Sequence, residues 1–214
     1  MRTVSWNCRG LGNPRAIRAL LRLIKLENPQ ILFLMETKLS ENEMEKVIIR
    51  CGYSCGLSVG CLGQGRERAG GLSLMWNDNL GISITSFSLN HIHRKVEDEV
   101  AWSVTGIYGF PDEVNKKKTW ALIQELASIV SYSWLCFGDF NDVLSLPGKQ
   151  GGDPRNFEQM RIDTECIKLC GLEDLGFTGY PFTWANGREG EEHIPCRLDR
   201  VLATHSFSNR FAPI

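Results

Sequence analysis

The chain has 214 residues, of which 43% are hydrophobic and 23% are charged, and its net charge is −1. These values indicate one soluble globular domain over residues 1–214 and exclude a protein that binds nucleic acid through overall positive charge alone. No apolar run approaches the length of a membrane span, and residues 1–10 do not resemble a signal peptide. We therefore expect an intracellular protein without membrane contact. Its eight cysteines are expected to be reduced thiols without structural zinc, because their spacing lacks paired CxxC motifs.

Apolar strands and amphipathic helices are predicted along the first half of the chain. The expected strands cover residues 2–7, 30–35, 53–59, 72–76, 82–89 and 100–108, and the expected helices cover 13–27 and 40–50. Ser40 and Glu43 predict a capping box at the start of the second helix. The last two strands are joined by a charged connection, in which His91 and His93 are expected at the surface.

The second half is predicted to continue with fewer strands and longer loops. The expected helices cover residues 115–130 and 157–170, a buried strand covers 133–137, and short strands cover 182–184 and 197–202. Along the whole chain, strands outnumber helices and do not alternate strictly with them. This pattern predicts two packed, mostly antiparallel sheets flanked by helices, a layered α/β sandwich.

Several predicted strands end in a polar side chain. These residues are Asn7, Glu36, Tyr108, and Asp139 with Asn141, while Asp199 lies within the last strand. Each has an ordinary structural explanation: a surface acid, a half-buried tyrosine at a sheet edge, or an Asx turn that closes a strand. Together, however, carboxylates and amides at corresponding strand ends are the oxygen ligands that Mg²⁺ prefers, and phosphoryl chemistry uses such sites.

Six short segments carry a resemblance to a known family. They are 6–12 (WNCRGLG), 35–38 (METK), 106–109 (GIYG), 138–141 (GDFN), 182–184 (FTW) and 197–202 (RLDRVL). In this order they resemble the endonuclease/exonuclease/phosphatase superfamily, and most of all the endonuclease domain of plant LINE-type (non-LTR) retrotransposons. The resemblance implies a four-layer α/β sandwich, cleavage of phosphodiester bonds in DNA with Mg²⁺ (or Mn²⁺) as cofactor, and a nuclear location.

The resemblance also implies roles for the strand-end residues. Glu36 is the expected main metal ligand, with Asn7 beside it. Tyr108 is expected to hydrogen-bond the scissile phosphate, and Asn141 to hold the phosphate in the transition state. Asp139 is expected to orient the attacking water or to protonate the leaving oxygen. Further candidates for contact with phosphate or DNA are Arg9, Arg66, Arg68, Trp184 and Arg197.

The sequence departs from the family pattern at its C-terminal end. Asp199 is expected to orient the family's catalytic histidine, which follows an aspartate in a Ser-Asp-His motif, and this motif is absent. His193 and His205 do not stand in that context. Because loss of a general base or of its orienting partner costs orders of magnitude in rate, we expect weak or no activity. We also expect a domain that is incomplete at its C-terminus, with the last strands of one sheet missing.

Three interpretations follow from these observations. The first is a DNA-nicking endonuclease module of a retroelement, joined to a downstream reverse transcriptase domain in a longer polyprotein. The second is a catalytically inactive remnant, without function or acting as a module that binds nucleic acid or protein. The third is a phosphatase of the same superfamily, although no substrate loop of that kind is recognised. The sequence predicts no oligomeric state.

Overall fold

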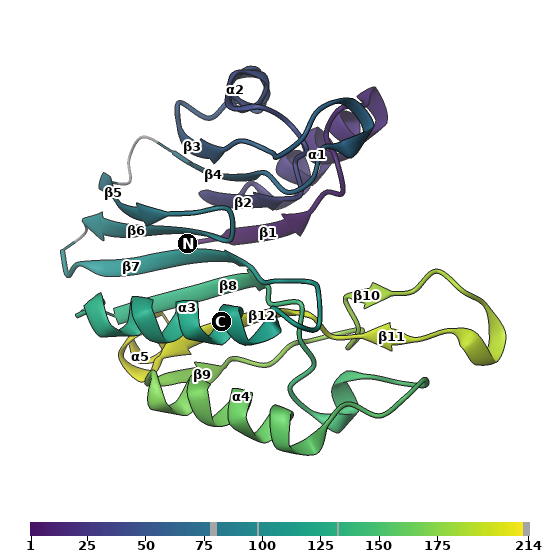
Figure 1. Ribbon diagram of the computed structural model, residues 1–214. Helices are drawn as coiled ribbons and strands as arrows, with labels where there is room; N and C mark the ends of the chain where they lie inside the picture. The colour runs from purple at the N-terminus through teal and green to yellow at the C-terminus, as the bar shows by residue number, and fades with distance from the viewer. Residues whose placement is uncertain (78–80, 98, 132, 212–214) are drawn as a thin grey trace. The chain divides into compact units, whose positions relative to one another are not determined.

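The structure is a computed structural model that describes residues 1–77, 81–97, 99–131 and 133–211 (Figure 1). Contacts within the chain divide it into two compact units, Met1–Tyr108 and Gly109–Ile214, which we call the N-unit and the C-unit and describe separately. The predicted single domain over 1–214 stays a prediction, as does its incomplete C-terminus. No helix among the described residues is long and apolar enough to cross a membrane.

The N-unit contains two helices, a 3₁₀ turn and seven strands among its described residues. These are β1 (Thr3–Asn7), α1 (Pro14–Glu27), β2 (Ile31–Met35), α2 (Glu41–Arg50), β3 (Cys55–Val59), η1 (Gly65–Glu67), β4 (Leu72–Trp76), β5 (Gly81–Phe87), β6 (His91–Glu97) and β7 (Trp102–Tyr108). One sheet has the order β1-β2-β4-β3, in which only β1 and β2 run parallel. Strands β5, β6 and β7 pair as antiparallel neighbours.

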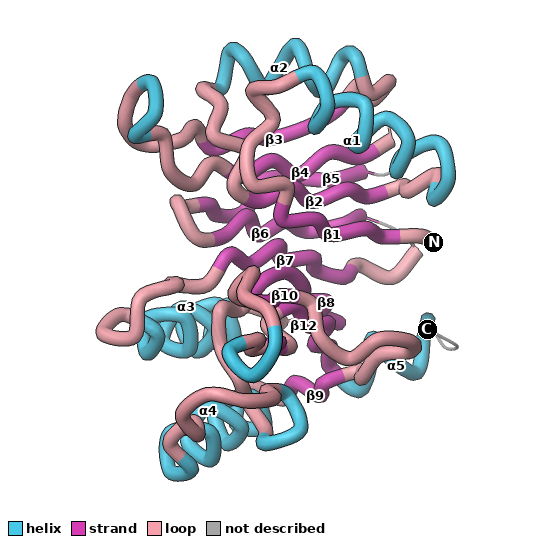
Figure 2. Tube along the Cα trace, turned by 90° about the vertical axis from the view of Figure 1, so that its right-hand side faces the viewer, coloured by secondary structure: helices cyan, strands magenta, loops and turns pink. Residues whose placement is uncertain are grey.

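Strand β2 is the centre of the N-unit core. All five of its residues are buried, because helices α1 and α2 cover one face of its sheet and β6 and β7 cover the other (Figures 1 and 2). Leu32 and Leu34 pack toward the helices, whereas Phe33 lies under β7. At Gly106 a β-carbon would come within 2.5 Å of the Phe33 ring, so only glycine fits there. The apolar run of β2 therefore reflects a strand buried on both faces.

The C-unit contains three helices and a smaller set of strands among its described residues. They are α3 (Lys116–Ile129), β8 (Ser133–Asp139), η2 (Leu146–Gly148), α4 (Phe157–Leu169), β9 (Leu172–Asp174), β10 (Trp184–Ala185), η3 (Gly190–Glu192), β11 (Pro195–Cys196), β12 (Asp199–Thr204) and α5 (His205–Phe211). Strand β12 lies between β8 and β9 and is antiparallel to both, and β10 and β11 form a separate hairpin.

The core of the C-unit forms around β8. Trp134, Cys136 and Phe137 are buried, as the unbroken apolar run predicts. Helix α3 packs against α4, and the Trp120 ring of α3 stacks on Phe140 with 5.8 Å between centroids. This stacking places the start of α3 next to the loop that follows β8.

Most predicted elements are confirmed, and the α/β fold class with helices flanking the sheets is confirmed as well. The described strands and α-helices that the sequence analysis did not predict are β6, which it treated as a charged connection, and the short β9, β11 and α5. The prediction that His91 and His93 lie at the surface is wrong, because both are buried. His91 lies between two serine hydroxyls of the β5 end, and His93 Nδ1 is 2.7 Å from Thr105 Oγ1 on β7. Polar side chains with such partners can be buried without loss of hydrogen bonds.

Candidate active site

The parallel pair of β1 and β2 brings two predicted metal ligands together in the N-unit. Asn7 is the register partner of Met35, so the next residue, Glu36, leaves the sheet beside it. Asn7 Nδ2 donates a hydrogen bond to Glu36 Oε1 at 2.7 Å, and the Tyr108 hydroxyl at the end of β7 donates to the same oxygen at 3.1 Å. The second oxygen, Oε2, accepts no hydrogen bond from the described residues. Three of the predicted site residues thus form one cluster.

The turn that carries Glu36 has an unusual backbone. Glu36 and Lys38 have φ values of 51° and 54°, in the left-handed region that costs a non-glycine residue about 1–2 kcal/mol. The Thr37 and Lys38 amides donate to the Gly71 and Gly70 carbonyls at 3.1 and 3.0 Å, which holds this conformation in place. Strained residues that surrounding structure holds in this way cluster at functional sites.

Cys8 supports the same turn from the β1 side. Its thiol donates to the Met35 carbonyl at 3.0 Å and lies 3.6 Å from the Glu36 carbonyl. Burial raises the pKa of the Cys8 thiol to about 12, so it stays protonated and remains a donor. Cys8 is therefore a structural residue rather than a nucleophile.

The residues around Glu36 suit a hard divalent cation. No group of three or more His, Cys, Asp or Glu that could hold a metal occurs in the described part of the chain. Mg²⁺ needs only one or two carboxylates and keeps several waters. Glu36 supplies a carboxylate that no basic side chain of the described ranges pairs with, and Asn7 supplies an amide group beside it. The donor set therefore fits Mg²⁺ or Mn²⁺.

The C-unit gathers the other predicted catalytic residues at the end of β8. Asp139 and Asp199 are register partners on β8 and β12, so two acids face one another across the strand pair. The Asn141 amide donates to Asp139 Oδ1 at 2.9 Å, which is the Asx turn that the sequence also allowed. Asn141 has a φ of 52°, and its Nδ2 donates to the Gly109 carbonyl at 2.8 Å. The Asn141 side chain is thus fixed rather than free to rotate.

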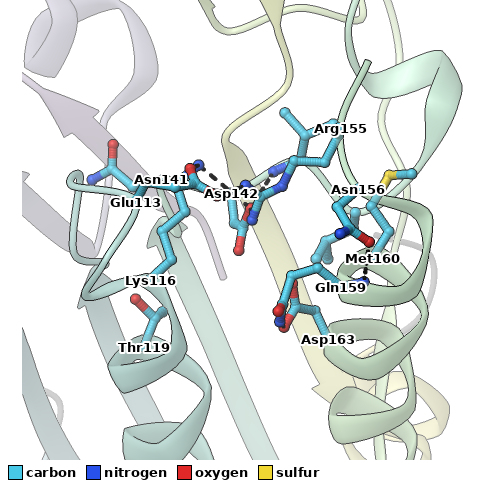
Figure 3. Close-up of polar contacts among 12 residues, drawn as sticks. Glu113, Lys116, Thr119, Asn141, Asp142, Arg155, Asn156, Gln159, Met160 and Asp163 are labelled. Carbon is cyan, nitrogen blue, oxygen red and sulfur yellow. Dashed lines mark hydrogen bonds and ion pairs between the residues drawn. The ribbon is translucent and has the colours of Figure 1, made fainter. Parts of the chain in front are cut away.

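A buried acid that the sequence analysis did not single out lies directly after this turn. Asp142 is 1% exposed, and Figure 3 shows basic side chains converging on it. Arg155 Nη2 lies 2.7 Å and Lys116 Nζ 3.7 Å from Asp142 Oδ1, and the Trp120 indole donates to Oδ2 at 3.2 Å. Arg155 and Lys116 also pair with Glu113. Asp142 thereby ties the loop after β8 to α3 and to the segment before α4.

Three of the predicted phosphate contacts lie in the N-unit. Arg9 is exposed, and its backbone amide donates to Asn7 Oδ1 at 3.3 Å. Arg66 is exposed in η1. Arg68 is half-buried and donates to Glu43 Oε2 at 2.7 Å. Contact of these arginines with phosphate stays a prediction.

The other two candidates lie in the C-unit. Arg197 pairs with Asp174 at 2.8 Å, and its guanidinium lies 4.7 Å from the centre of the Phe177 ring. Trp184 is exposed on β10, opposite Cys196 of β11. Both contacts with DNA stay predictions.

The two histidines of the C-unit have contacts of their own in the structure. His193 Nδ1 is 3.0 Å from the Arg188 carbonyl, and His205 Nδ1 is 3.8 Å from Glu173. Both histidines therefore contact groups other than Asp199. The role of Asp199 stays a prediction, and the sequence contains no Ser-Asp-His segment.

Comparison with solved structures shows the same fold in two endonucleases and a 3′ phosphatase. The endonuclease domain of TRAS1, a telomere-specific non-LTR retrotransposon, matches with a TM-score of 0.68 and 14% identity, covering 97% of this chain and 87% of that one. The 3′ phosphatase NExo from Neisseria, bound to a product DNA hairpin, matches with a TM-score of 0.70 and 15% identity, covering 98% and 88%. An AP endonuclease from Archaeoglobus fulgidus matches with a TM-score of 0.69 and 20% identity, covering 95% and 87%. At these identities the likeness shows the fold.

Sequence comparison gives the family directly. No curated protein sequence matches significantly. The family model described as Endonuclease/Exonuclease/phosphatase family matches residues 4–213, nearly the whole chain. The resemblance read from the six segments is confirmed, and the chain belongs to the endonuclease/exonuclease/phosphatase family.

Proposed function

We propose that the chain is a Mg²⁺- or Mn²⁺-dependent hydrolase that nicks DNA, the endonuclease module of a retroelement, with weak or no activity in this form. The observation that carries the proposal is the hydrogen bonding of the Glu36 carboxylate. Two neutral donors, Asn7 and Tyr108, hold one carboxylate oxygen and leave the other without a hydrogen bond from the described residues. A carboxylate held in this way keeps its negative charge for an external cation.

In this proposal, the metal ion and individual residues of the chain have separate roles in the reaction. When bound, the metal ion supplies Lewis-acid stabilisation of the charge that develops on the phosphate. Asn7 and Tyr108 orient Glu36, and in the proposed role the Tyr108 hydroxyl turns from Glu36 to the phosphate when the substrate binds. Asp139 orients the attacking water, and Asn141, whose side chain is anchored on Gly109, holds the phosphate. We assign no general base among the described residues, and slow turnover is part of the proposal.

The retroelement setting, DNA as substrate and a nuclear location belong to the same proposal. TRAS1, whose endonuclease domain has this fold, is a telomere-specific non-LTR retrotransposon. A downstream reverse transcriptase domain in a longer chain would complete such an element.

Two other functions are alternatives to this proposal. NExo, which shares the fold, is a 3′ phosphatase, so removal of a terminal phosphate is the second candidate. The third candidate is a module that binds nucleic acid or protein without turnover. Hydrolysis of a 3′-phosphorylated oligonucleotide with no plasmid nicking would favour the former, and DNA binding with neither reaction would favour the latter.

Substitution of Glu36 tests the proposal. Glu36→Gln keeps an oxygen that accepts from Asn7 and Tyr108 but removes the charge. We expect calorimetry to show weak Mg²⁺ binding by the wild type and at least about tenfold weaker binding by this variant. The control is Glu27→Gln, which changes an exposed acid paired with Arg2 and should bind Mg²⁺ like the wild type.

Two results would contradict the proposal. Absence of Mg²⁺ and Mn²⁺ binding by the wild type would exclude the metal site, and equal binding by Glu36→Gln would place it elsewhere. In a supercoiled-plasmid assay we expect feeble nicking. Rapid nicking that is lost in Asp139→Ala would show that the reaction does not need the absent histidine.

A further inference from the structure

Arg68 links the turn that carries Glu36 to the start of helix α2. Its Nη1 atom donates to Glu43 Oε2 at 2.7 Å and to the Lys38 carbonyl at 3.3 Å. Lys38 is one of the two left-handed residues of this turn. One guanidinium nitrogen therefore connects the strained turn to a fixed point on a helix.

Glu43 is a firm anchor for Arg68. Its Oε2 also accepts from the Ser40 backbone amide at 2.8 Å, and the Ser40 hydroxyl accepts from the Glu43 amide at 3.3 Å. This reciprocal capping box, which the sequence predicted, fixes the carboxylate at the first turn of α2. The Ser40 amide and then the Arg68 side chain lower the pKa of Glu43 to about 2, so the anchor is charged at every ordinary pH.

The same glycine-rich segment supplies the other supports of the turn. Gly70 and Gly71 accept from the Lys38 and Thr37 amides, and the Cys61 amide donates to the Leu39 carbonyl at 3.0 Å. A β-carbon on Gly71 would collide with the Thr37 hydroxyl, so this approach requires glycine. The segment from Cys61 to Gly71 thus surrounds the turn, and Arg68 is its only charged side chain that bonds to the turn among the described residues.

We propose that Arg68 is a positioning residue, which orients the Glu36 carboxylate by holding the Lys38 carbonyl of the same turn. The inference rests on the proposed function, since it gives Arg68 a part in building the metal site. It differs from the predicted contact with phosphate. In the structure, Nη1 of Arg68 is already occupied by Glu43 and by the Lys38 carbonyl, both of which belong to the protein.

The chain offers a closely matched control. Arg2 Nη1 also donates to one carbonyl and one carboxylate, both belonging to Glu27, at 2.8 and 3.4 Å. This pair joins the start of β1 to the end of α1 and does not touch the Glu36 turn. Arg68→Met and Arg2→Met therefore remove the same kind of interaction, and only the first removes it at the proposed site.

The test uses a reporter that does not depend on bound metal. Asn7 Nδ2 donates to Glu36 Oε1, so the NMR signals of its side-chain amide report the carboxylate position. Their loss in Asn7→Ala assigns them. In the metal-free protein, we expect Arg68→Met to shift or broaden these signals and Arg2→Met to leave them unchanged. In Mg²⁺ titrations, we expect about tenfold weaker binding for Arg68→Met alone, as when a group that orients a metal ligand is removed.

The outcomes separate this inference from the proposed function. Unchanged Asn7 signals in folded Arg68→Met would overturn the positioning role, whatever the metal affinity. A wild type that binds no Mg²⁺ would overturn the proposed function, while the Asn7 signals would still decide the role of Arg68. If Arg68→Met does not fold, Glu43→Gln preserves the acceptor for Ser40 and weakens the anchor of Arg68, and a smaller shift of the same signals is expected. Arg68→Lys should restore part of the wild-type signal position.

Discussion

Two carboxylates follow buried strands, Glu36 after β2 and Asp142 shortly after β8, and they differ in the charge of the groups that contact them. Glu36 is half-buried and receives hydrogen bonds from the neutral groups of Asn7 and Tyr108. Asp142 is fully buried between the cations Arg155 and Lys116. The negative charge of an acid that is paired with basic side chains is already balanced within the protein, so it attracts a metal ion weakly. The negative charge of an acid that is bound only by neutral donors is not balanced and can attract a cation.

The comparison separates stability from function. Removing one partner of a buried ion pair leaves the other charges uncompensated, which is strongly destabilising. Replacing Glu36 by its amide removes no internal ion pair from the described residues and leaves both hydrogen-bond donors an acceptor. The fold should therefore depend on Asp142, and metal binding on Glu36.

The largest expected effect is that of Asp142→Asn. The variant loses the charge that balances Arg155 and Lys116, although Glu113 still pairs with both. We expect the free energy of unfolding to fall by about 3 kcal/mol, the low end for a broken buried pair. Urea denaturation followed by circular dichroism measures this loss. Glu36→Gln serves as the comparison, with an expected change below about 1 kcal/mol, and equal losses in the two variants would break the distinction drawn above.

His93 is expected to make the N-unit sensitive to acid. Burial, with a smaller contribution from His91, lowers the pKa of His93 to about 4. Since an unfolded histidine titrates near 6.5, the unfolded state takes up protons first as the pH falls. The stability associated with neutral His93 is fully present above about pH 6.5 and is lost as the pH falls toward 4, about 2 kcal/mol of it by pH 5.

Substitution of His93 tests this sign. His93→Gln keeps a group that can pair with the Thr105 hydroxyl and removes the titration. When the pH is lowered from 7 to 5, we expect His93→Gln to lose about 2 kcal/mol less unfolding free energy than the wild type. His205→Gln, at an exposed histidine, should keep the wild-type pH dependence. An unchanged profile in His93→Gln would show that His93 is not the titrating group.

The sequence was sufficient for the strand-end placement of Glu36 but not for the shape of its turn. The apolar run of β2 ends at Met35, so the position of the acid could be predicted. Nothing in the local sequence requires left-handed backbone at Glu36 and Lys38. The supports are Gly70 and Gly71, more than thirty residues away, and such tertiary contacts override local preference.

The burial of β6 and of Asp142 escaped prediction for a related reason. A polar residue is predicted to be exposed unless its interaction partner in the fold is known. The partners of these residues lie on other elements. Arg94 is buried with its guanidinium 4.2 Å from the centre of the Trp76 ring, on β4. Asp142 finds Arg155 beyond an intervening loop and Lys116 on a preceding helix. Periodicity along one segment cannot reveal pairs of this kind.

Asp163, next to the Asp142 cluster in the C-unit, should respond to pH in the opposite direction from His93. It is 1% exposed on α4; Gln159 donates to its Oδ1 at 2.8 Å, and Oδ2 has no hydrogen-bond partner among the described residues (Figure 3). Burial, reinforced by the charge of Asp142, raises the pKa of Asp163 to about 6. The folded state therefore holds a proton that the unfolded state releases near pH 4. Stability from this group is present below about pH 4 and is lost as the pH rises through 6.

Asp163→Asn makes the smallest of these changes measurable. The amide cannot ionise, so the variant should gain about 1 kcal/mol of unfolding free energy over the wild type when the pH is raised from 5 to 7. Asp153→Asn, at an exposed acid in the preceding loop, is the matched control and should follow the wild type. Because His93 and Asp163 act with opposite signs over the same range, their effects largely cancel in the wild type. The slope of unfolding free energy against pH should therefore change in opposite directions in His93→Gln and Asp163→Asn. A change in the same direction in both variants would show that one of the two assignments is wrong.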